Sequence, residues 1–246
     1  MYLKTTRYRK GTTMEENNII AQTEKKIETI ILNIKDLINK HALVSGFTAL
    51  IIIAGIIVII VWLSRQEKRE QEASIHVNKI ISALAQAKNS QNALTREQTV
   101  AGISSELAAA VSNYSGLKNS LRAQFALAGV KYESAAFKEA GDLYLALFNK
   151  NKKYYLAPLS LLYAACCLEE AGEYSSAIAK LLLFRKYYER HYIYPEALFA
   201  LARNYKLDNK FTDARREYSQ IEKKFPNSSW SQKAREELDL MALGGK

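Results

Sequence analysis

One stretch of the chain is apolar without interruption. Residues 42–64 contain no formally charged side chain, and they are bounded by His41 and Arg65. The central part of this block, Leu43 to Leu63, would measure about 31 Å as an α-helix, and the hydrocarbon core of a bilayer is about 30 Å thick. The pattern therefore predicts one transmembrane helix over residues 42–64, followed by basic residues at the level of the headgroups.

Two other structures also produce long apolar runs. A buried core helix of a globular domain rarely exceeds about ten to fourteen apolar residues and usually keeps a polar stripe. A cleaved signal peptide has a short basic start, an apolar run of about 7–15 residues and a small-residue cleavage site. Here about forty mostly polar residues come first, and no A-x-A site lies close behind the block, so we expect an uncleaved anchor.

The residues before the block have a helical pattern. Between residues 15 and 40, isoleucine and leucine recur at spacings of three, four and seven, which is typical of an amphipathic helix. Such a helix can lie on the lipid surface or pack on the helices of a partner, and we favour the lipid surface. Residues 1–41 are therefore expected to form a tail and an amphipathic juxtamembrane helix.

Helical spacing continues after the block. The apolar residues predict one helix over residues 65–88, a polar loop over 89–92 and a second helix over about 97–113. Gly116 and its neighbours then break the pattern. Residues 65–120 are therefore expected to be linking helices that lead into a separate carboxyl-terminal part.

The carboxyl-terminal half contains an internal repeat of 37 residues. Three blocks, 121–157, 158–194 and 195–231, align without gaps. Each carries an aromatic residue followed three positions later by alanine, namely Phe137 and Ala140, Tyr174 and Ala177, and Phe211 and Ala214. The small residue lets two antiparallel helices approach closely, and the aromatic ring fills the space beside it. Helix pairs of this size must stack to bury their apolar faces, so we expect three stacked pairs, then a capping helix and tail over residues 232–246.

These positions resemble the tetratricopeptide repeat, and the third block resembles it most. The residues that match the motif there are Leu198, Leu201, Ala202, Tyr205, Ala214, Tyr218, Ile221 and Pro226. The second block has Leu168 at the aromatic position and Glu189 in place of proline, and the first has Lys131 at the aromatic position. The expected fold class is all-α, with a single N-terminal transmembrane helix followed by a tetratricopeptide-repeat-like α-solenoid.

The order of the segments is similar to that of the bacterial YfgM-like family. The resemblance comprises a short tail, an amphipathic helix ending at Lys40-His41, one span, a basic helix with Glu72-Ala73-Ser74 and degenerate tetratricopeptide repeats. That family comprises inner-membrane ancillary subunits of the Sec translocon. The resemblance implies an inner-membrane protein with a cytoplasmic amino terminus and a periplasmic repeat domain. The basic residues flank the block almost equally, so the positive-inside rule alone leaves the topology open.

Composition narrows the classes of function. A hydrophobic content of 48% excludes a disordered chain, and two cysteines exclude a disulfide scaffold. The adjacent Cys166 and Cys167 point about 100° apart on a helix and are expected to pack as small apolar side chains. No Walker loop, G-x-S-x-G or G-x-G-x-x-G motif occurs, and the three histidines lack the spacing of metal ligands. We therefore expect no enzyme, no metal and no cofactor.

The net charge of +10 bears on the partners. Residues 150–155 and 185–188 combine lysine or arginine with tyrosine, a mixture that could bind nucleic acid. Because a membrane anchor is predicted, anionic headgroups, an acidic protein partner or plain solvent are the expected neighbours instead. No nucleic-acid partner is expected.

If the chain binds proteins, the tetratricopeptide resemblance implies where. In such repeats the first helix of each pair lines a concave face. The candidate partner-binding residues of this groove are Phe125, Tyr132, Leu162, Glu169, Phe199, Arg203 and Lys206. An apolar ladder flanked by mixed charge suits an extended or helical peptide. The competing interpretation is that the apolar residues bury against residues 97–113 folded into the groove, which would leave no open site.

The leading hypothesis is a membrane-anchored protein–protein interaction adaptor. The family resemblance implies an ancillary translocon or periplasmic chaperone-network factor, with Sec translocon subunits, secreted or unfolded polypeptides and periplasmic chaperones as partners. The alternative is a structural scaffold of a cell-envelope or outer-membrane protein assembly machine, because residues 225–229 and the helix after them resemble the repeats of outer-membrane assembly lipoproteins. Those proteins carry a lipid-modified cysteine in place of a span, and no cysteine lies near the amino terminus here.

Overall fold

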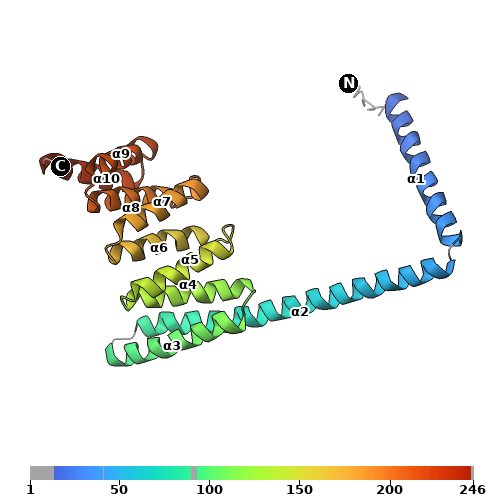
Figure 1. Ribbon diagram of the computed structural model, residues 1–246, viewed down its shortest axis with the longest axis horizontal. Helices are drawn as coiled ribbons and strands as arrows, with labels where there is room; N and C mark the ends of the chain where they lie inside the picture. Colours follow the sequence, from blue (N-terminus) through green and yellow to red (C-terminus); the bar gives the residue numbers. More distant parts are fainter. Residues whose placement is uncertain (1–13, 41, 90–92, 245–246) are drawn as a thin grey trace, which may run out of the picture. The chain divides into compact units, whose positions relative to one another are not determined.

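The computed structural model describes residues 14–40, 42–89 and 93–244, and the regular structure of these residues is helical throughout. The predicted amino-terminal tail, His41 and most of the predicted loop at 89–92 lie outside the described residues. The helices are α1 (Met14–Lys40), α2 (Ala42–Lys88), α3 (Ala93–Asn113), α4 (Lys118–Glu133), α5 (Phe137–Lys150), α6 (Ala157–Glu170), α7 (Tyr174–Tyr188), α8 (Tyr194–Leu207), α9 (Phe211–Lys224) and α10 (Ser229–Leu243) (Figure 1).

The chain divides into two compact units, residues 1–66 and 67–246. In the first unit the apolar face of α1 is exposed at Ile27, Ile30, Ile31 and Ile34. The described part of α2 from Thr48 onward is, by length and composition, able to cross a membrane, and none of its most apolar window is buried by protein. The apolar block is therefore helical as expected, and its part from Thr48 onward differs from a core helix in having no protein cover.

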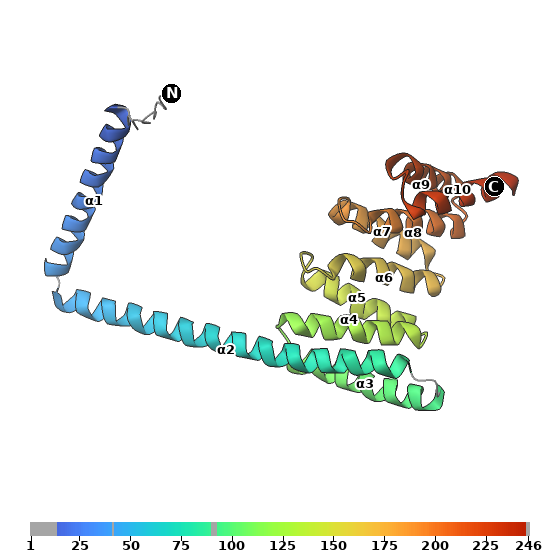
Figure 2. The same cartoon turned by 180° about the vertical axis from the view of Figure 1, so that it is seen from behind.

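The second unit begins with the last part of α2, which packs with α3 onto α4 (Figure 2). The buried cluster that joins these three helices comprises Val77, Ile80, Leu84, Ala87, Ile103, Leu107, Ala110, Ala123, Leu127 and Val130. A carboxylate oxygen of Glu70 also accepts a hydrogen bond from the backbone N–H of Lys118 at 2.9 Å. The residues expected to be linkers thus form a further helix pair at the amino end of the stack.

The three predicted repeats are the pairs α4–α5, α6–α7 and α8–α9, which stack in chain order (Figure 1). The turns within the pairs repeat as well. Ala135, Gly172 and Asn209 lie 37 residues apart, and their φ angles are +59°, +76° and +59°. Glycine adopts this left-handed conformation freely, whereas a side chain there costs about 1–2 kcal/mol, so Ala135 holds the turn under strain. One backbone geometry thus recurs at a spacing of 37 residues along the stack.

Small residues bring the helices together, as the sequence predicts. Ala140, Ala177 and Ala214 are fully buried. The helices α5 and α6 pack closely at Gly141, because a Cβ atom added there would lie 3.3 Å from the Cβ of Cys167. A larger side chain at these positions would push the helices apart.

The helix α10 closes the carboxyl end of the stack and packs on α9. It starts at Ser229, because Ser228 caps it: the Ser228 Oγ accepts a hydrogen bond from the backbone N–H of Ser231 at 3.1 Å. The buried side chains of Ala234 and Met241 join the main apolar cluster, so α10 is part of the core.

One carboxylate is buried between the second and third repeats. The side chain of Glu217 in α9 is 1% exposed and forms an ion pair with Arg185 of α7. A guanidinium nitrogen of Arg216 lies 3.4 Å from the other carboxylate oxygen. The pair therefore joins α7 to α9 through a carboxylate that is withdrawn from water.

Candidate functional site

An aromatic pocket lies where the first and second repeats meet. Its rings are Phe125 of α4, Tyr144 of α5 and Tyr163 of α6, with centroids 5.3–5.9 Å apart. Gly129 leaves room beside them, because a Cβ atom there would still be 3.6 Å from the hydroxyl of Tyr144. The cavity measures about 390 Å³, and its other lining residues are Tyr132, Glu133 and Cys166. The pocket has the size and character to hold an apolar side chain.

Carboxylates surround this aromatic pocket. The hydroxyl of Tyr132 donates a hydrogen bond to Glu170 at 3.3 Å, and burial followed by the charge of Glu170 raises the pKa of Tyr132 to about 12. Burial, and next the charge of Glu196, raise the pKa of Tyr163. A segment that places an apolar side chain in the pocket and a lysine or arginine beside it would match this surface.

The thiol of Cys166 lines the pocket in its protonated form. Burial raises its pKa to about 11, with the charge of Glu169 adding to the shift and that of Arg203 opposing it. Burial likewise raises the pKa of Cys167 to about 12, and both thiols are free. A protonated thiol is a poor nucleophile, so these groups act in packing.

We expect the free energy of unfolding to fall at alkaline pH. Because burial raises the pKa of Cys166 from 9.0 to about 11, folding favours the protonated thiol. Its contribution to stability is complete below pH 9 and is lost as the pH rises from 9 to 11. Urea denaturation at a series of pH values should show a shallower decline for Cys166→Ser than for the parent chain. An equally steep decline in both would contradict the shift.

The carboxyl-terminal half of the predicted groove is packed. Phe199 is 8% exposed, and its ring lies 5.3 Å from that of Tyr218 and 5.2 Å from that of Trp230 in α10. Leu162 is 1% exposed and belongs to the main apolar cluster. These two residues are therefore core residues and not the accessible ladder that the sequence predicts. The reason is that the first helices also pack on their neighbours, and α10 covers the last one.

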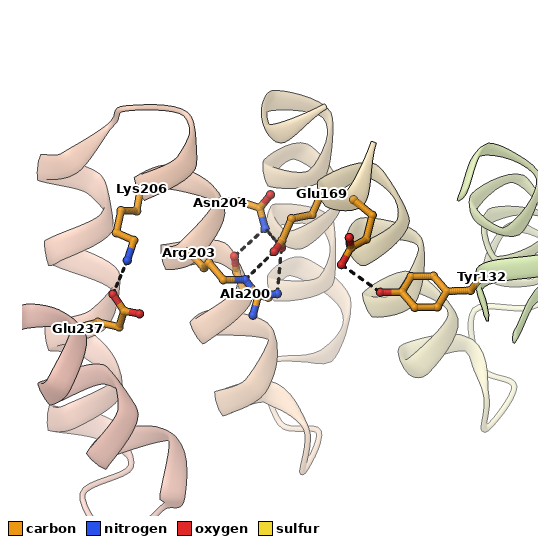
Figure 3. Close-up of polar contacts among 8 residues, drawn as sticks. Tyr132, Glu169, Ala200, Arg203, Asn204, Lys206 and Glu237 are labelled. Carbon is orange, nitrogen blue, oxygen red and sulfur yellow. Dashed lines mark hydrogen bonds and ion pairs between the residues drawn. The ribbon is translucent and has the colours of Figure 1, made fainter. Parts of the chain in front are cut away.

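The charged candidates tie the first helices of successive repeats together (Figure 3). Glu169 of α6 accepts hydrogen bonds from Arg203 at 2.9 Å and from the buried amide of Asn204 at 2.6 Å. Lys206 of α8 forms a 2.5 Å ion pair with Glu237 of α10. Glu169, Arg203 and Lys206 thus have partners within the stack, which leaves Phe125 and Tyr132 as the candidates that line an open pocket.

Residues 97–113 do not enter this pocket. The buried side chains of α3 pack against Ala123, Leu127 and Val130 of α4, whereas the pocket is lined by Phe125 and Gly129 of the same helix. Among the described residues, none from α3 lines it. The part of the groove that the chain itself fills is instead the carboxyl-terminal part beneath α10.

Comparison with known proteins agrees with this architecture. The tetratricopeptide repeat family matches residues 196–228, which lie in the third repeat. This segment of the chain is therefore a tetratricopeptide repeat. The apo form of RapI is similar to 68% of this chain with a TM-score of 0.53 and 16% identity, and the match covers 46% of RapI, less than half its length.

A second solved structure is similar at a lower level. The TPR-like repeats of a putative kinesin light chain from Podosopora anserina match 64% of this chain and 93% of theirs, with a TM-score of 0.45 and 16% identity. Among curated proteins, none matches the chain. At 16% identity the likeness to RapI concerns the fold of the stack alone.

Proposed function

We propose that this chain is a membrane-anchored adaptor that binds protein segments in its aromatic pocket. Solenoids of tetratricopeptide type generally serve as non-catalytic scaffolds that bind other proteins on extended surfaces. The observation that carries the proposal is the pocket itself. Tyr163 is exposed and Phe125 is only half-buried, although the equivalent face of the third repeat is closed. Exposed rings around a cavity are typical of binding sites.

The chemistry of the pocket indicates the kind of segment. A volume of about 390 Å³ accommodates one or two apolar side chains, and the edges and faces of three rings suit an aromatic or long aliphatic group. The carboxylates of Glu170 and Glu196 nearby favour a segment that also carries lysine or arginine. Short apolar and basic stretches of this kind are exposed in unfolded or secreted polypeptides.

The proposal of a membrane anchor is supported by the uncovered apolar part of α2 and by the resemblance to the YfgM-like family. On this basis the amino terminus is cytoplasmic and the stack periplasmic, at a bacterial inner membrane. The partners are Sec translocon subunits, secreted or unfolded polypeptides, or periplasmic chaperones. Protease digestion of the stack in intact spheroplasts tests this topology, and protection until the inner membrane is lysed would contradict it.

Crosslinking of the full chain in living cells tests the pocket. A photoreactive residue at Tyr163 should form adducts with translocon subunits or secreted chains, whereas one at the exposed Leu182 of α7, outside the pocket, should not. Gly129→Leu should fill the pocket and lower the adduct yield at least fivefold without unfolding the helix, because leucine is a better helix former than glycine.

The outcomes separate the candidate functions. Adducts with envelope assembly proteins would favour the scaffold alternative. Equal yields at Tyr163 and Leu182, or yields that Gly129→Leu leaves unchanged, would show that the pocket is not the binding site.

A further inference from the structure

The loops along one edge of the stack form a second distinctive surface, which we call the tyrosine edge. It comprises residues 150–156 between α5 and α6, and residues 186–193 at the end of α7 and before α8. The two segments contain five lysines or arginines and a single carboxylate, that of Glu189. Tyr155 is 61% exposed and Tyr192 is 78% exposed. Aromatic and cationic side chains thus face outward together.

Hydrogen bonds hold these loops side by side. The hydroxyl of Tyr188 donates to the backbone carbonyl of Lys152 at 2.7 Å, which joins the second loop to the first. A cavity of about 940 Å³ lies between them, and its lining includes Tyr154, Tyr155 and Tyr187. The tyrosine edge is therefore one continuous surface with a cavity, and not two independent loops.

The cations of this edge lack acidic partners. Within the part of the chain that the structure describes, Glu189 pairs with Lys224 of α9, and the five cations of the tyrosine edge form no ion pair. Lys152 lies instead 4.8 Å from the centre of the Tyr187 ring. Like charges held close together repel, so an anion from outside the chain would stabilise this arrangement.

The opposite edge of the stack differs in this respect. Three of its cations have carboxylate partners, in the pairs Lys131–Glu139 at 2.7 Å, Arg203–Glu169 at 2.7 Å and Lys210–Asp208 at 2.6 Å. The turns there also carry Glu133, Glu170 and Glu173. The two edges thus differ, because the cations of the tyrosine edge are unpaired, whereas those named on the other edge are neutralised by carboxylates.

The tyrosine edge is also connected to the part of α2 that directly follows the apolar block. The hydroxyl of Tyr154 donates to the backbone carbonyl of Lys118 at 3.1 Å. The backbone N–H of Lys118 donates to Glu70 at 2.9 Å, and Glu70 follows Ser64, the last residue of the block, by only six positions. Two hydrogen bonds therefore connect the edge to a residue just past the predicted span.

We propose that the tyrosine edge docks on the anionic phospholipid headgroups of the bilayer that holds α2. The inference rests on the proposed membrane anchor. Clustered lysine and arginine are attracted to anionic lipid, and tyrosine rings settle at the level of the headgroups. Basic and aromatic side chains can also bind nucleic acid, but this edge is hydrogen-bonded to a segment that begins only six residues after a span, so lipid is the anionic surface that the chain itself brings near. Docking holds the stack in one orientation on the membrane.

Headgroup quenching in the full chain tests this proposal. The chain is reconstituted in nanodiscs, with Cys166→Ser and Cys167→Ser, and a fluorophore is attached either at Tyr192→Cys on the tyrosine edge or at Ala171→Cys. The second site is the matched control, because it lies in the exposed turn between α6 and α7 on the opposite edge. A lipid spin-labelled in its headgroup should quench position 192 at least threefold more than position 171 in discs that contain phosphatidylglycerol.

A triple substitution of lysines tests whether electrostatic attraction drives the docking. In Lys150→Gln/Lys152→Gln/Lys153→Gln, quenching at 192 should fall to the level at 171, as it should in phosphatidylcholine discs or in high salt. Lys150, Lys152 and Lys153 form no ion pair within the stack, so circular dichroism should show an unchanged fold. Equal quenching at the two sites, or quenching that survives the triple substitution, would overturn the proposal.

The experiments distinguish a wrong membrane-anchor proposal from a wrong lipid-docking proposal. A chain that alkaline extraction removes from the discs contradicts the anchor. Salt-sensitive flotation of that chain with added phosphatidylglycerol vesicles would still support the edge, and loss of flotation would overturn it. An oligonucleotide that binds the chain and abolishes quenching at position 192 would identify nucleic acid as the occupant and overturn the lipid proposal.

Discussion

Replacing Arg185 with leucine is expected to lower the free energy of unfolding by about 3–5 kcal/mol. The reason is that the two partners are buried to different degrees. The carboxylate of Glu217 is 1% exposed, and Arg185 supplies its closest positive charge. Without it, the carboxylate is left in the core with Arg216 at 3.4 Å as the remaining cation. Removing one partner of a buried ion pair lowers the free energy of unfolding by more than the intact pair contributes to it. The reason is that the remaining charge stays buried and cannot be hydrated.

Urea denaturation followed by circular dichroism measures this loss. The double variant Arg185→Leu/Glu217→Leu should recover much of the stability, because it removes the stranded carboxylate as well. The matched control is Arg235→Leu, which breaks an exposed 2.9 Å pair with Glu222 and should cost about 1 kcal/mol or less. If Arg185→Leu cost no more than Arg235→Leu, the Arg185–Glu217 pair would not be buried in solution.

Replacing Phe199 with alanine should cost about 3–5 kcal/mol, whereas the same change at the equivalent Phe125 should cost markedly less. Phe199 is 8% exposed and packs on Tyr218 and Trp230, so its loss leaves a cavity beneath α10. Phe125 borders the open pocket, where water and neighbouring rings can fill the space. Chemical denaturation of both variants measures the difference.

The fluorescence of Trp230 provides a second way to compare Phe199→Ala with Phe125→Ala. In Phe199→Ala the indole loses its ring partner, so its emission should shift towards that of solvent-exposed tryptophan at lower denaturant concentrations. In Phe125→Ala it should keep the behaviour of the parent chain. Equal losses of stability in the two variants would mean that α10 does not cover the groove.

The repeat stack is largely predictable from the sequence, because its pattern recurs within the chain. The buried alanines at 140, 177 and 214 and the aromatic residues before them mark the helix crossings at a fixed period. The beginning of the stack is not predictable in this way. The last part of α2 and α3 lack the 37-residue pattern, and their buried side chains acquire a partner only when α4 packs on them.

The candidate site is predictable in outline and not in detail. The tetratricopeptide resemblance identifies the helices whose faces could bind a partner, and Phe125 and Tyr132 do line the pocket. Which positions stay open depends on the size of opposing side chains. Gly129 leaves space, whereas Trp230 removes it over Phe199, and both effects arise from contacts between residues far apart in the sequence. Tyr144 and Tyr163 escaped prediction because they lie outside the positions that the resemblance names.

The left-handed turns bear on the order in which the stack assembles. Repeat proteins can nucleate folding at any unit and then propagate to neighbours. The first repeat must place Ala135 in a conformation that Gly172 adopts freely and Asn209 tolerates. The largest apolar cluster also lies mainly in the second and third repeats. Folding is therefore expected to nucleate near the carboxyl end. The ribosome synthesises the first repeat before the other two, yet this repeat is expected to fold last.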